Sequence, residues 1–103
     1  MQAFMEKVTP SQALHRSRQL IRELATRYRT TNPRVFGSVL DGQDNEDSDL
    51  DVLVEPTAET TLFDLGGLQA SLEEALQVRV DIRTPMDLPS HIRAKVLDEA
   101  MPV

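Results

Sequence analysis

The chain has 103 residues, a formal net charge of −6 and no cysteine. This length fits one domain, and the lack of cysteine excludes disulfide bonds, a thiol nucleophile and a thiolate metal site. The acidic total argues against nucleic acid as a partner, and no apolar run is long enough to span a bilayer. Because the amino terminus does not resemble a signal peptide, we expect a cytoplasmic protein without membrane contact.

Charge is divided unevenly along the chain. Residues 1–40 carry seven lysines and arginines and two acidic residues, whereas residues 41–103 carry four basic and fifteen acidic residues. Six of the acidic residues lie between Asp41 and Asp51. Three of them are expected to be solvated loop residues, namely Asp44, Glu46 and Asp47. The cluster as a whole raises the question of which cation it holds.

The first predicted helix begins at Pro10. Thr9 is a favourable N-cap, proline is favoured at the first helical position, and Gln12 completes a capping box. Residues 30–33 (Thr-Thr-Asn-Pro) are expected to end the helix. Its apolar face at helical spacing consists of Leu14, Ile21, Leu24, Ala25 and Tyr28, with Leu20 nearby.

Three strands are predicted after this helix. Residues 34–36 form a short strand, residues 39–48 form a polar loop in which Ser48 caps a turn, and residues 49–55 form the second strand. Side chains alternate along a strand, so the second strand has an apolar face and an acidic face. The apolar face carries Leu50, Val52 and Val54, and the other carries Asp49, Asp51 and Leu53. The third strand repeats the pattern over residues 78–83, with Val78, Val80 and Ile82 opposite Arg79, Asp81 and Arg83.

Two further helices are predicted. One spans Thr61 to Leu76, with Thr61 and Asp64 as a cap pair and an apolar stripe of Leu65, Leu68, Leu72 and Leu76. Gly66 and Gly67 inside it indicate either the close approach of another backbone or a later helix start. The last helix spans residues 89–100, and its inward residues are expected to be Ile92, Val96, Leu97 and Ala100. Phe36 and Phe63 are expected in the core, and His15 and His91 on the surface.

This order of elements predicts an α/β (α+β) fold in a single domain over residues 1–103. The first two strands should pair antiparallel, and the second and third should pair parallel through a right-handed crossover. Helices would cover one face of a small mixed sheet. The open face would bring together three carboxylates, those of Asp49, Asp51 and Asp81.

Three converging carboxylates repel one another unless a cation lies between them. Mg²⁺ prefers oxygen ligands and commonly combines carboxylates with phosphates, and two such ions can hold a phosphoryl group for in-line attack. Gly37 and Ser38 follow the first strand, where glycine allows a close backbone approach and serine offers a hydroxyl and an amide. The residues therefore indicate a phosphate and metal site.

The spacing of these residues resembles a known signature. Gly37-Ser38, ten residues, Asp49-Leu50-Asp51 and a later Asp81 on a strand are similar to the pattern of the DNA polymerase β-like nucleotidyltransferase superfamily. The chain looks most like its smallest members, the minimal nucleotidyltransferases of prokaryotes. These are often the antitoxin component of HEPN–MNT toxin–antitoxin pairs. The resemblance covers nearly the whole chain, from about Val8 onwards.

The resemblance implies a role for each residue of the pattern. Gly37 and Ser38 would hold the β- and γ-phosphates of a nucleoside triphosphate, and Asp49 and Asp51 would ligate Mg²⁺. Asp81 would ligate a second Mg²⁺ or act as the base for the attacking hydroxyl. The implied reaction transfers AMP from ATP to a hydroxyl, with a tyrosine of a partner HEPN toxin as the implied acceptor.

One position departs from the family pattern. Relatives commonly carry a basic residue three positions after the serine, where this chain has Asp41. This departure favours an alternative function, in which the protein neutralises a toxin by complex formation without catalysis. An accessory subunit of a larger transferase is a third alternative. The nucleobase and the oligomeric state, including a homo-oligomer, are left open by the sequence.

Overall fold

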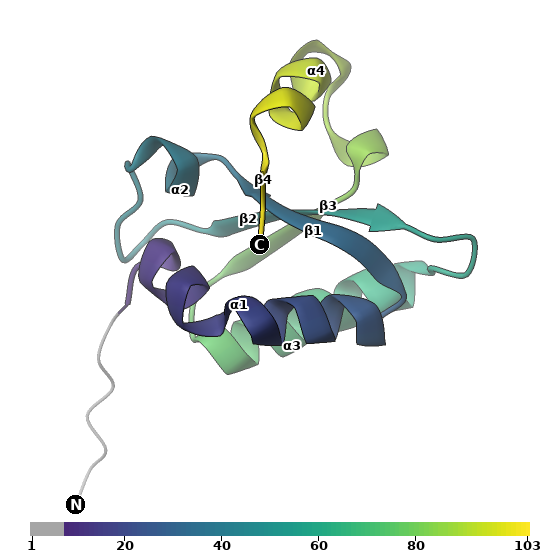
Figure 1. The fold of residues 1–103 in the computed structure, drawn as a ribbon, viewed down its shortest axis with the longest axis horizontal. Helices are drawn as coiled ribbons and strands as arrows, with labels where there is room; N and C mark the ends of the chain where they lie inside the picture. Colours follow the sequence, from purple (N-terminus) through teal and green to yellow (C-terminus); the bar gives the residue numbers. More distant parts are fainter. Residues whose placement is uncertain (1–7) are drawn as a thin grey trace, which may run out of the picture.

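The computed structural model describes residues 8–103 as a mixed sheet with helices packed against one face (Figure 1). The four strands have the order β3-β2-β1-β4. Along the chain the elements are α1 (Pro10–Arg27), β1 (Thr30–Phe36), α2 (Ser38–Asp41), β2 (Leu50–Pro56), α3 (Leu62–Leu76), β3 (Val80–Arg83), η1 (Pro85–Asp87), α4 (Ser90–Glu99) and β4 (Met101–Pro102). The predicted fold class is thus confirmed.

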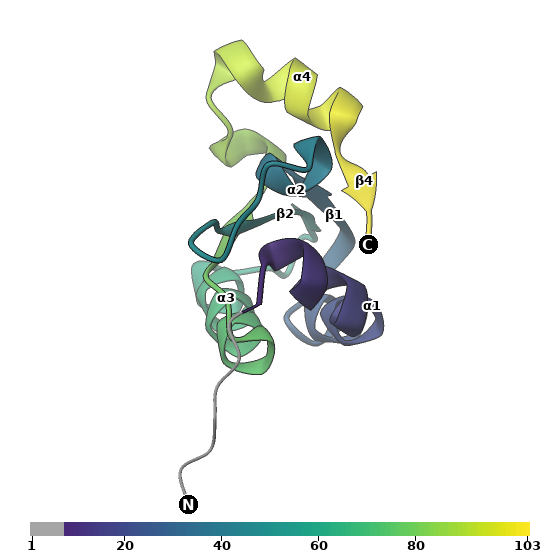
Figure 2. The same ribbon diagram turned by 90° about the vertical axis from the view of Figure 1, so that its left-hand side faces the viewer.

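Helices α1 and α3 lie side by side on one face of the sheet, and α4 lies beyond the other face (Figures 1 and 2). The core fills the space between the sheet and the helix pair. It includes Ile21 of α1, Leu68 and Leu72 of α3, and the β2 side chains Leu50, Val52 and Val54. The alternation predicted for β2 is therefore confirmed, and it leaves Asp51 on the opposite face.

Helix α1 begins as predicted. Thr9 accepts a hydrogen bond from the Gln12 backbone amide, and the Gln12 side chain accepts one from the Thr9 amide. The helix is kinked at Ser17, where the backbone is not helical, and it ends at Arg27. These local interactions are readable from sequence because every partner lies within three positions.

Strand β1 begins at Thr30, earlier than predicted. The segment 30–33, expected only to end the helix, forms an irregular start of the strand. The register with β2 shifts between Thr31 and Arg34, and Asn32 has a φ of 50°. Proline at position 33 has no amide hydrogen to donate, so the strand bulges there and then continues.

Strand pairing follows the predicted topology. Strands β1 and β2 are antiparallel, and β2 and β3 are parallel, with Leu50 opposite Val80. A fourth strand was not predicted. It pairs Met101 of β4 with Val35 of β1. Strand β4 has only two residues, one of them a proline, so the sequence shows no alternating pattern there. The strand is therefore seen only in the tertiary structure.

Gly67 is explained by a side chain, and not by either alternative considered from sequence, a close backbone or a later helix start. A Cβ added to Gly67 would lie 2.6 Å from Cε1 of Tyr28, whereas Gly66 has nothing within 4 Å. The Tyr28 hydroxyl is hydrogen-bonded to the Ser71 hydroxyl at 2.7 Å. The glycine thus lets the ring at the end of α1 lie directly on α3, which fixes the helix pair.

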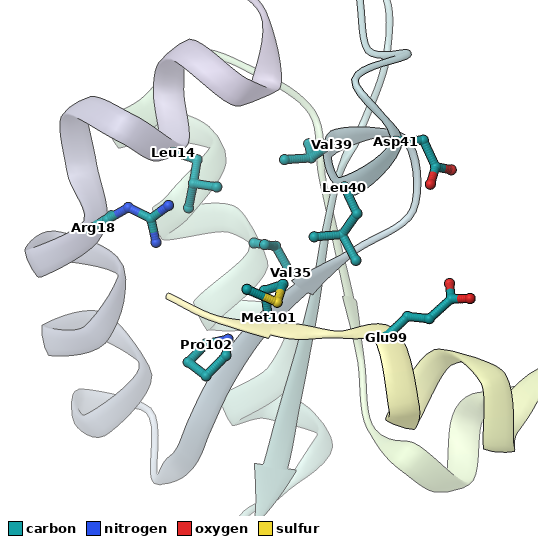
Figure 3. A pocket seen from close by; sticks show the side chains of 9 residues that line it. All are labelled: Leu14, Arg18, Val35, Val39, Leu40, Asp41, Glu99, Met101 and Pro102. Carbon is teal, nitrogen blue, oxygen red and sulfur yellow. The ribbon is translucent and has the colours of Figure 1, made fainter.

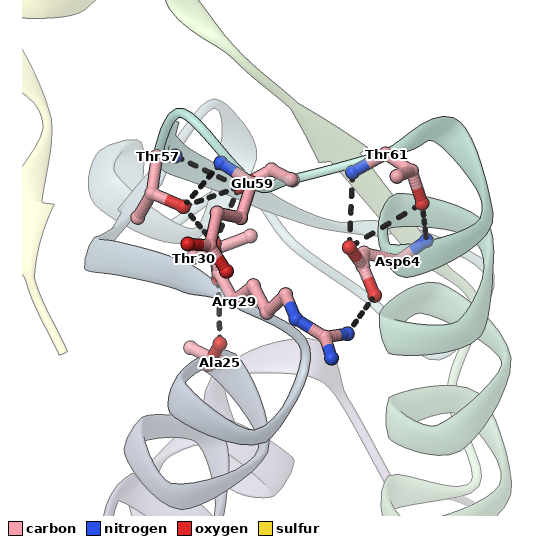
Figure 4. Close-up of polar contacts among 8 residues, drawn as sticks. Ala25, Arg29, Thr30, Thr57, Glu59, Thr61 and Asp64 are labelled. Carbon is pink, nitrogen blue, oxygen red and sulfur yellow. Dashed lines mark hydrogen bonds and ion pairs between the residues drawn. The ribbon is translucent and has the colours of Figure 1, made fainter.

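The end of the sheet remote from Asp51 is fixed by a polar network (Figure 4). Thr61 and Asp64 form the predicted capping box of α3, and Arg29 forms an ion pair with Asp64 at 3.2 Å. The Arg29 carbonyl accepts hydrogen bonds from the hydroxyls of Thr57 and Thr60. These contacts join the start of β1, the turn after β2 and the start of α3.

Two expectations about burial are wrong. Helix α4 has no buried residue, and Leu97, expected to face inward, is 36% exposed, because α4 lies over the open face of the sheet and not on the core. Phe63 is 91% exposed at the start of α3, and Phe36 is half-buried outside the main core. His15 and His91 are exposed, as predicted. Within residues 8–103, no helix has the length and apolar character needed to cross a membrane.

Candidate active site

Asp51 and Asp81 are register partners on the parallel strands β2 and β3. On its other side, Asp51 is paired with Phe36 of β1. Leu50 and Val52 point into the core, so the Asp51 side chain projects from the open face. The sheet therefore brings together two of the three predicted carboxylates through backbone register alone.

The pKa of Asp51 is raised from 3.8 to about 6. Partial burial is the largest cause, because it disfavours the charged form, and the negative charges of Asp81 and then Asp49 add to it. Arg83 acts in the opposite direction. Asp51 is therefore the centre of the acidic group, and a cation at this point would relieve an unfavourable charge.

Each of the two outer carboxylates is paired with an arginine. Arg79 contacts Asp49 at 3.0 Å, and Arg83 contacts Asp81 at 3.1 Å. Within residues 8–103, no three acidic or histidine side chains are gathered closely enough to hold a metal ion. Binding a metal to all three aspartates would therefore require the arginines to release Asp49 and Asp81.

The donor set nevertheless fits a hard divalent cation. Carboxylate oxygens are the ligands that Mg²⁺ prefers, and the pKa of Asp51, raised by partial burial and then by the charges of Asp81 and Asp49, marks a carboxylate whose charged form a bound cation would stabilise. Asp51 would be the central ligand, with Asp81 across the register and Asp49 two positions earlier.

Gly37 is required where β1 turns into α2. Its φ of 77° and ψ of −145° are accessible to glycine but not to other residues without strain. A Cβ at this position would also overlap Oδ2 of Asp51. The group close to Gly37 in this structure is the Asp51 carboxylate, and the approach of a phosphate to this backbone stays a prediction. Ser38, half-buried, begins the helical turn α2 directly beside it.

Two adjoining cavities lie between this part of the sheet and α4. One has a volume of about 270 Å³ and is lined by Asp51, Asp81 and Arg83, among others. The other has a volume of about 320 Å³, and its lining includes Gly37 and Lys95. Phe36 and Ile92 line both. Sequence reasoning placed Ile92 and Val96 on the inner side of α4, and both line the cavity at Gly37, but it did not identify the contribution of Lys95 from the same side.

A larger cavity, about 730 Å³, lies between α1, α2 and β4 (Figure 3). Its lining is mainly apolar and is formed by Leu14, Arg18, Val35, Val39, Leu40, Asp41, Glu99, Met101 and Pro102. It shares Leu40, Asp41 and Glu99 with the cavity at Gly37 but contains none of the three aspartates. Choosing the site by cavity volume alone would therefore place it away from Asp49, Asp51 and Asp81.

The loop between α2 and β2 is fixed to α1 by Asp44, which we expected to be a solvated loop acid. The Ser11 amide and hydroxyl donate to the Asp44 carboxylate at 2.8 and 2.7 Å. Partial burial raises the Asp44 pKa, but these hydrogen bonds outweigh it and the net pKa is lowered. Ser48 caps a turn at Asn45, as predicted. The partner of Asp44 lies 33 positions away, so sequence gave no signal for it.

The chain matches the family model described as nucleotidyltransferase domain over residues 17–102. It is 37% identical over 80 residues to the protein adenylyltransferase MntA of Thermococcus cleftensis, covering 78% of this chain and 81% of that protein. It is 36% identical over 69 residues to a Methanocaldococcus jannaschii protein assigned as a protein adenylyltransferase, covering 67% and 74%.

Two solved structures are similar in fold. A structure assigned as a minimal nucleotidyltransferase is 38% identical, has a TM-score of 0.81 and covers 99% of this chain and 100% of its own. A toxin–antitoxin structure with AMP-PNP is 19% identical, has a TM-score of 0.68 and covers 84% of this chain and 70% of its own. At that identity the second likeness concerns the fold alone.

Proposed function

The chain belongs to the nucleotidyltransferase domain family, as one of its minimal members, and we propose that it is a Mg²⁺-dependent protein adenylyltransferase that acts as an antitoxin. Its substrate would be ATP, and the acceptor would be a hydroxyl of a partner toxin. The observation that carries the proposal is the position of Asp51, between Asp81 across the sheet and Gly37 at the start of α2.

The proposed nucleotide site is built from two adjacent features. Gly37 allows a close approach of ligand atoms to the backbone, and Ser38 offers an amide and a hydroxyl to phosphate oxygens. The triphosphate would lie between this turn and α4, next to the acidic residues. Two Mg²⁺ ions held by Asp49, Asp51 and Asp81 would neutralise phosphate charge and the charge that develops during transfer.

The transfer step forms one bond and breaks one. The acceptor oxygen attacks the α-phosphorus of ATP, and the bond from that phosphorus to the bridging oxygen of pyrophosphate breaks. Where Asp81 is not a ligand of the second Mg²⁺, it would act as the base and accept the hydroxyl proton, since it lines the same cavity as Asp51. The products are adenylylated protein and pyrophosphate.

A protein acceptor fits the relatives. The two similar proteins named above are assigned as protein adenylyltransferases. We propose a tyrosine of a HEPN toxin as the acceptor and the neighbouring reading frame as its source. Recognition would then depend largely on the toxin itself.

The test is a transfer assay with the purified neighbouring protein. ATP labelled at the α-phosphate should label that protein in the presence of Mg²⁺, and ATP labelled at the γ-phosphate should not. Asp51→Asn should remove the labelling and leave complex formation intact. A stable complex with no α-label in any metal would contradict transfer and favour neutralisation by binding alone.

A further inference from the structure

We infer that Lys95 of α4 binds the β- and γ-phosphates of the nucleoside triphosphate, an inference that rests on the proposed function. A triphosphate needs cationic partners, yet the turn that follows Gly37 and Ser38 carries an aspartate, Asp41, and no basic residue. A side-chain cation that adds to the charge of Mg²⁺ would therefore come from another element that faces the turn.

The cavity beside Gly37 points to that element. It has a volume of about 320 Å³ and is lined on one side by Gly37, Leu40 and Asp41, and on the other by α4. Among the eight described residues that line it, Lys95 is the one with a positive charge. A phosphate held by the Gly37 turn would thus share a cavity with the Lys95 ammonium.

The face of α4 that carries Lys95 is defined by its spacing. Ile92, Lys95, Val96 and Glu99 follow the i, i+3, i+4, i+7 pattern, and all four line this cavity. Because residues at this spacing share one side of a helix, Lys95 does not reach the cavity as an isolated side chain. The whole inner face of α4 is directed at the Gly37 turn.

The position of α4 is fixed at both ends. Before the helix, Arg93 donates hydrogen bonds to the carbonyls of Pro85 and Leu88 at 2.8 and 2.9 Å, and Leu88 is buried. After the helix, β4 pairs with β1, and the Val103 amide donates to the Pro33 carbonyl at 3.0 Å. These contacts hold the Lys95 face toward the end of β1.

Three arginines near the open face already have carboxylate partners. Arg79 is paired with Asp49, Arg83 with Asp81, and Arg34 with Glu55. Within residues 8–103, no ion pair involves Lys95, which is exposed. Recruiting Lys95 to a phosphate therefore breaks no ion pair seen here, whereas recruiting any of these three arginines would.

The two acids that share the cavity make Lys95 more important. Asp41 and Glu99 also line it, so without Lys95 the triphosphate would face two carboxylates and no lysine or arginine. Like charges in one partly exposed cavity repel, and salt reduces the repulsion. Removing Lys95 should thus weaken ATP binding most at low ionic strength.

The test compares the affinities of ATP and AMP, both with Mg²⁺, by calorimetry. Lys95→Met should weaken ATP binding about tenfold, the effect of one charge-assisted hydrogen bond, because the β- and γ-phosphates lose their cation. AMP lacks those phosphates, so its affinity should stay the same. Lys95→Arg should retain ATP binding, and Arg16→Met, which removes an exposed charge on α1 remote from the cavity, should change neither affinity.

Other outcomes overturn the inference in distinguishable ways. If wild type and Lys95→Met bind ATP equally well while Ser38→Ala binds ATP more weakly, Lys95 does not bind the phosphates. The proposed function would then still stand. Equal losses for ATP and AMP, or a lower melting temperature of Lys95→Met, would assign Lys95 a structural role. A changed KM for the partner protein alone would make the cavity an acceptor site. Failure of wild type to bind either nucleotide would reject the proposed function and the inference together.

Discussion

The Asp51 carboxylate occupies the space that a Cβ on residue 37 would need. Gly37 therefore links the end of β1 to the acidic group on β2, and the two parts of the proposed site are in direct contact. This relationship gives the Gly-Ser pair a physical meaning beyond its spacing. It also makes the first prediction specific to one glycine among the four in the chain.

Gly37→Ala should lower the stability of the protein by about 2 kcal/mol, since the new methyl group meets both an unfavourable φ and the Asp51 carboxylate. Thermal unfolding measures this loss, since each kcal/mol lowers the melting temperature by roughly 4–8 °C. Gly42→Ala is the matched control, because Gly42 has a similar φ of 68° but open space around it. If Asp51→Ala does not reduce the cost of Gly37→Ala, the contact is not its cause.

Asp51→Asn should stabilise the metal-free protein near neutral pH. The pKa of Asp51 is raised to about 6 in the folded state, so the folded protein holds a proton that the unfolded chain releases. The resulting destabilisation is absent below about pH 3.8 and complete above about pH 6. It should amount to roughly 1–2 kcal/mol after solvent screening.

Melting curves of wild type and Asp51→Asn at pH 4 and pH 7.5, each with EDTA or with Mg²⁺, measure this effect. The gain in stability should be present at pH 7.5 in EDTA and nearly absent at pH 4. Mg²⁺ should raise the midpoint of wild type and have little effect on the variant. Equal Mg²⁺ shifts in both proteins would mean that the ion does not bind at Asp51.

Ser38→Ala should affect mainly nucleotide binding, whereas Asp51→Asn should affect transfer itself. Ser38 offers one hydroxyl, and its loss should weaken MgATP binding by about 1 kcal/mol without abolishing transfer. Asp51 is the proposed central metal ligand, so its replacement should abolish metal-dependent transfer. Affinities from calorimetry and single-turnover rates separate the two effects. Retained metal-dependent transfer in Asp51→Asn would count against the assignment.

Asp41→Arg should tighten ATP binding by up to about fivefold at low salt, because it exchanges an opposing charge in the cavity for a favourable one. Since Asp41 and Lys95 line the same cavity, the two substitutions should not be additive. Asp41→Arg should partly rescue Lys95→Met, and a double-mutant cycle of ATP affinities measures the coupling. Strict additivity would mean that residues 41 and 95 act independently, and an unchanged ATP affinity of Asp41→Arg at low salt would place residue 41 away from the phosphates.

The parts predicted well from sequence depend on neighbouring residues. The capping box at Thr9, the cap pair of Thr61 and Asp64, and the alternation around Asp51 all involve residues a few positions apart. The register between Asp51 and Asp81 followed from adding one topological rule, the parallel crossover, to that alternation. For this reason, the sequence was sufficient to predict that Asp51 and Asp81 lie on one face of the sheet.

The parts missed depend on contacts between distant positions. Tyr28 on Gly67, Ser11 on Asp44 and the pairing of β4 with β1 leave no periodic signal in the sequence. On α4, Ile92 and Val96 face the site as predicted, whereas Leu97 is exposed and the place of Lys95 beside the Gly37 turn is seen only in the structure. The hydrogen bonds of Arg93 and the pairing of β4 with β1 hold α4 next to the acidic residues.

The mass of the partner protein, co-expressed with this chain, tests the account most directly. Wild type should add the mass of AMP to the partner, at a tyrosine located by peptide fragmentation, and Asp51→Asn should leave the partner unmodified although the two proteins still associate. An unmodified partner with wild type, under conditions in which the purified protein binds MgATP, would contradict adenylyl transfer as the function of this site.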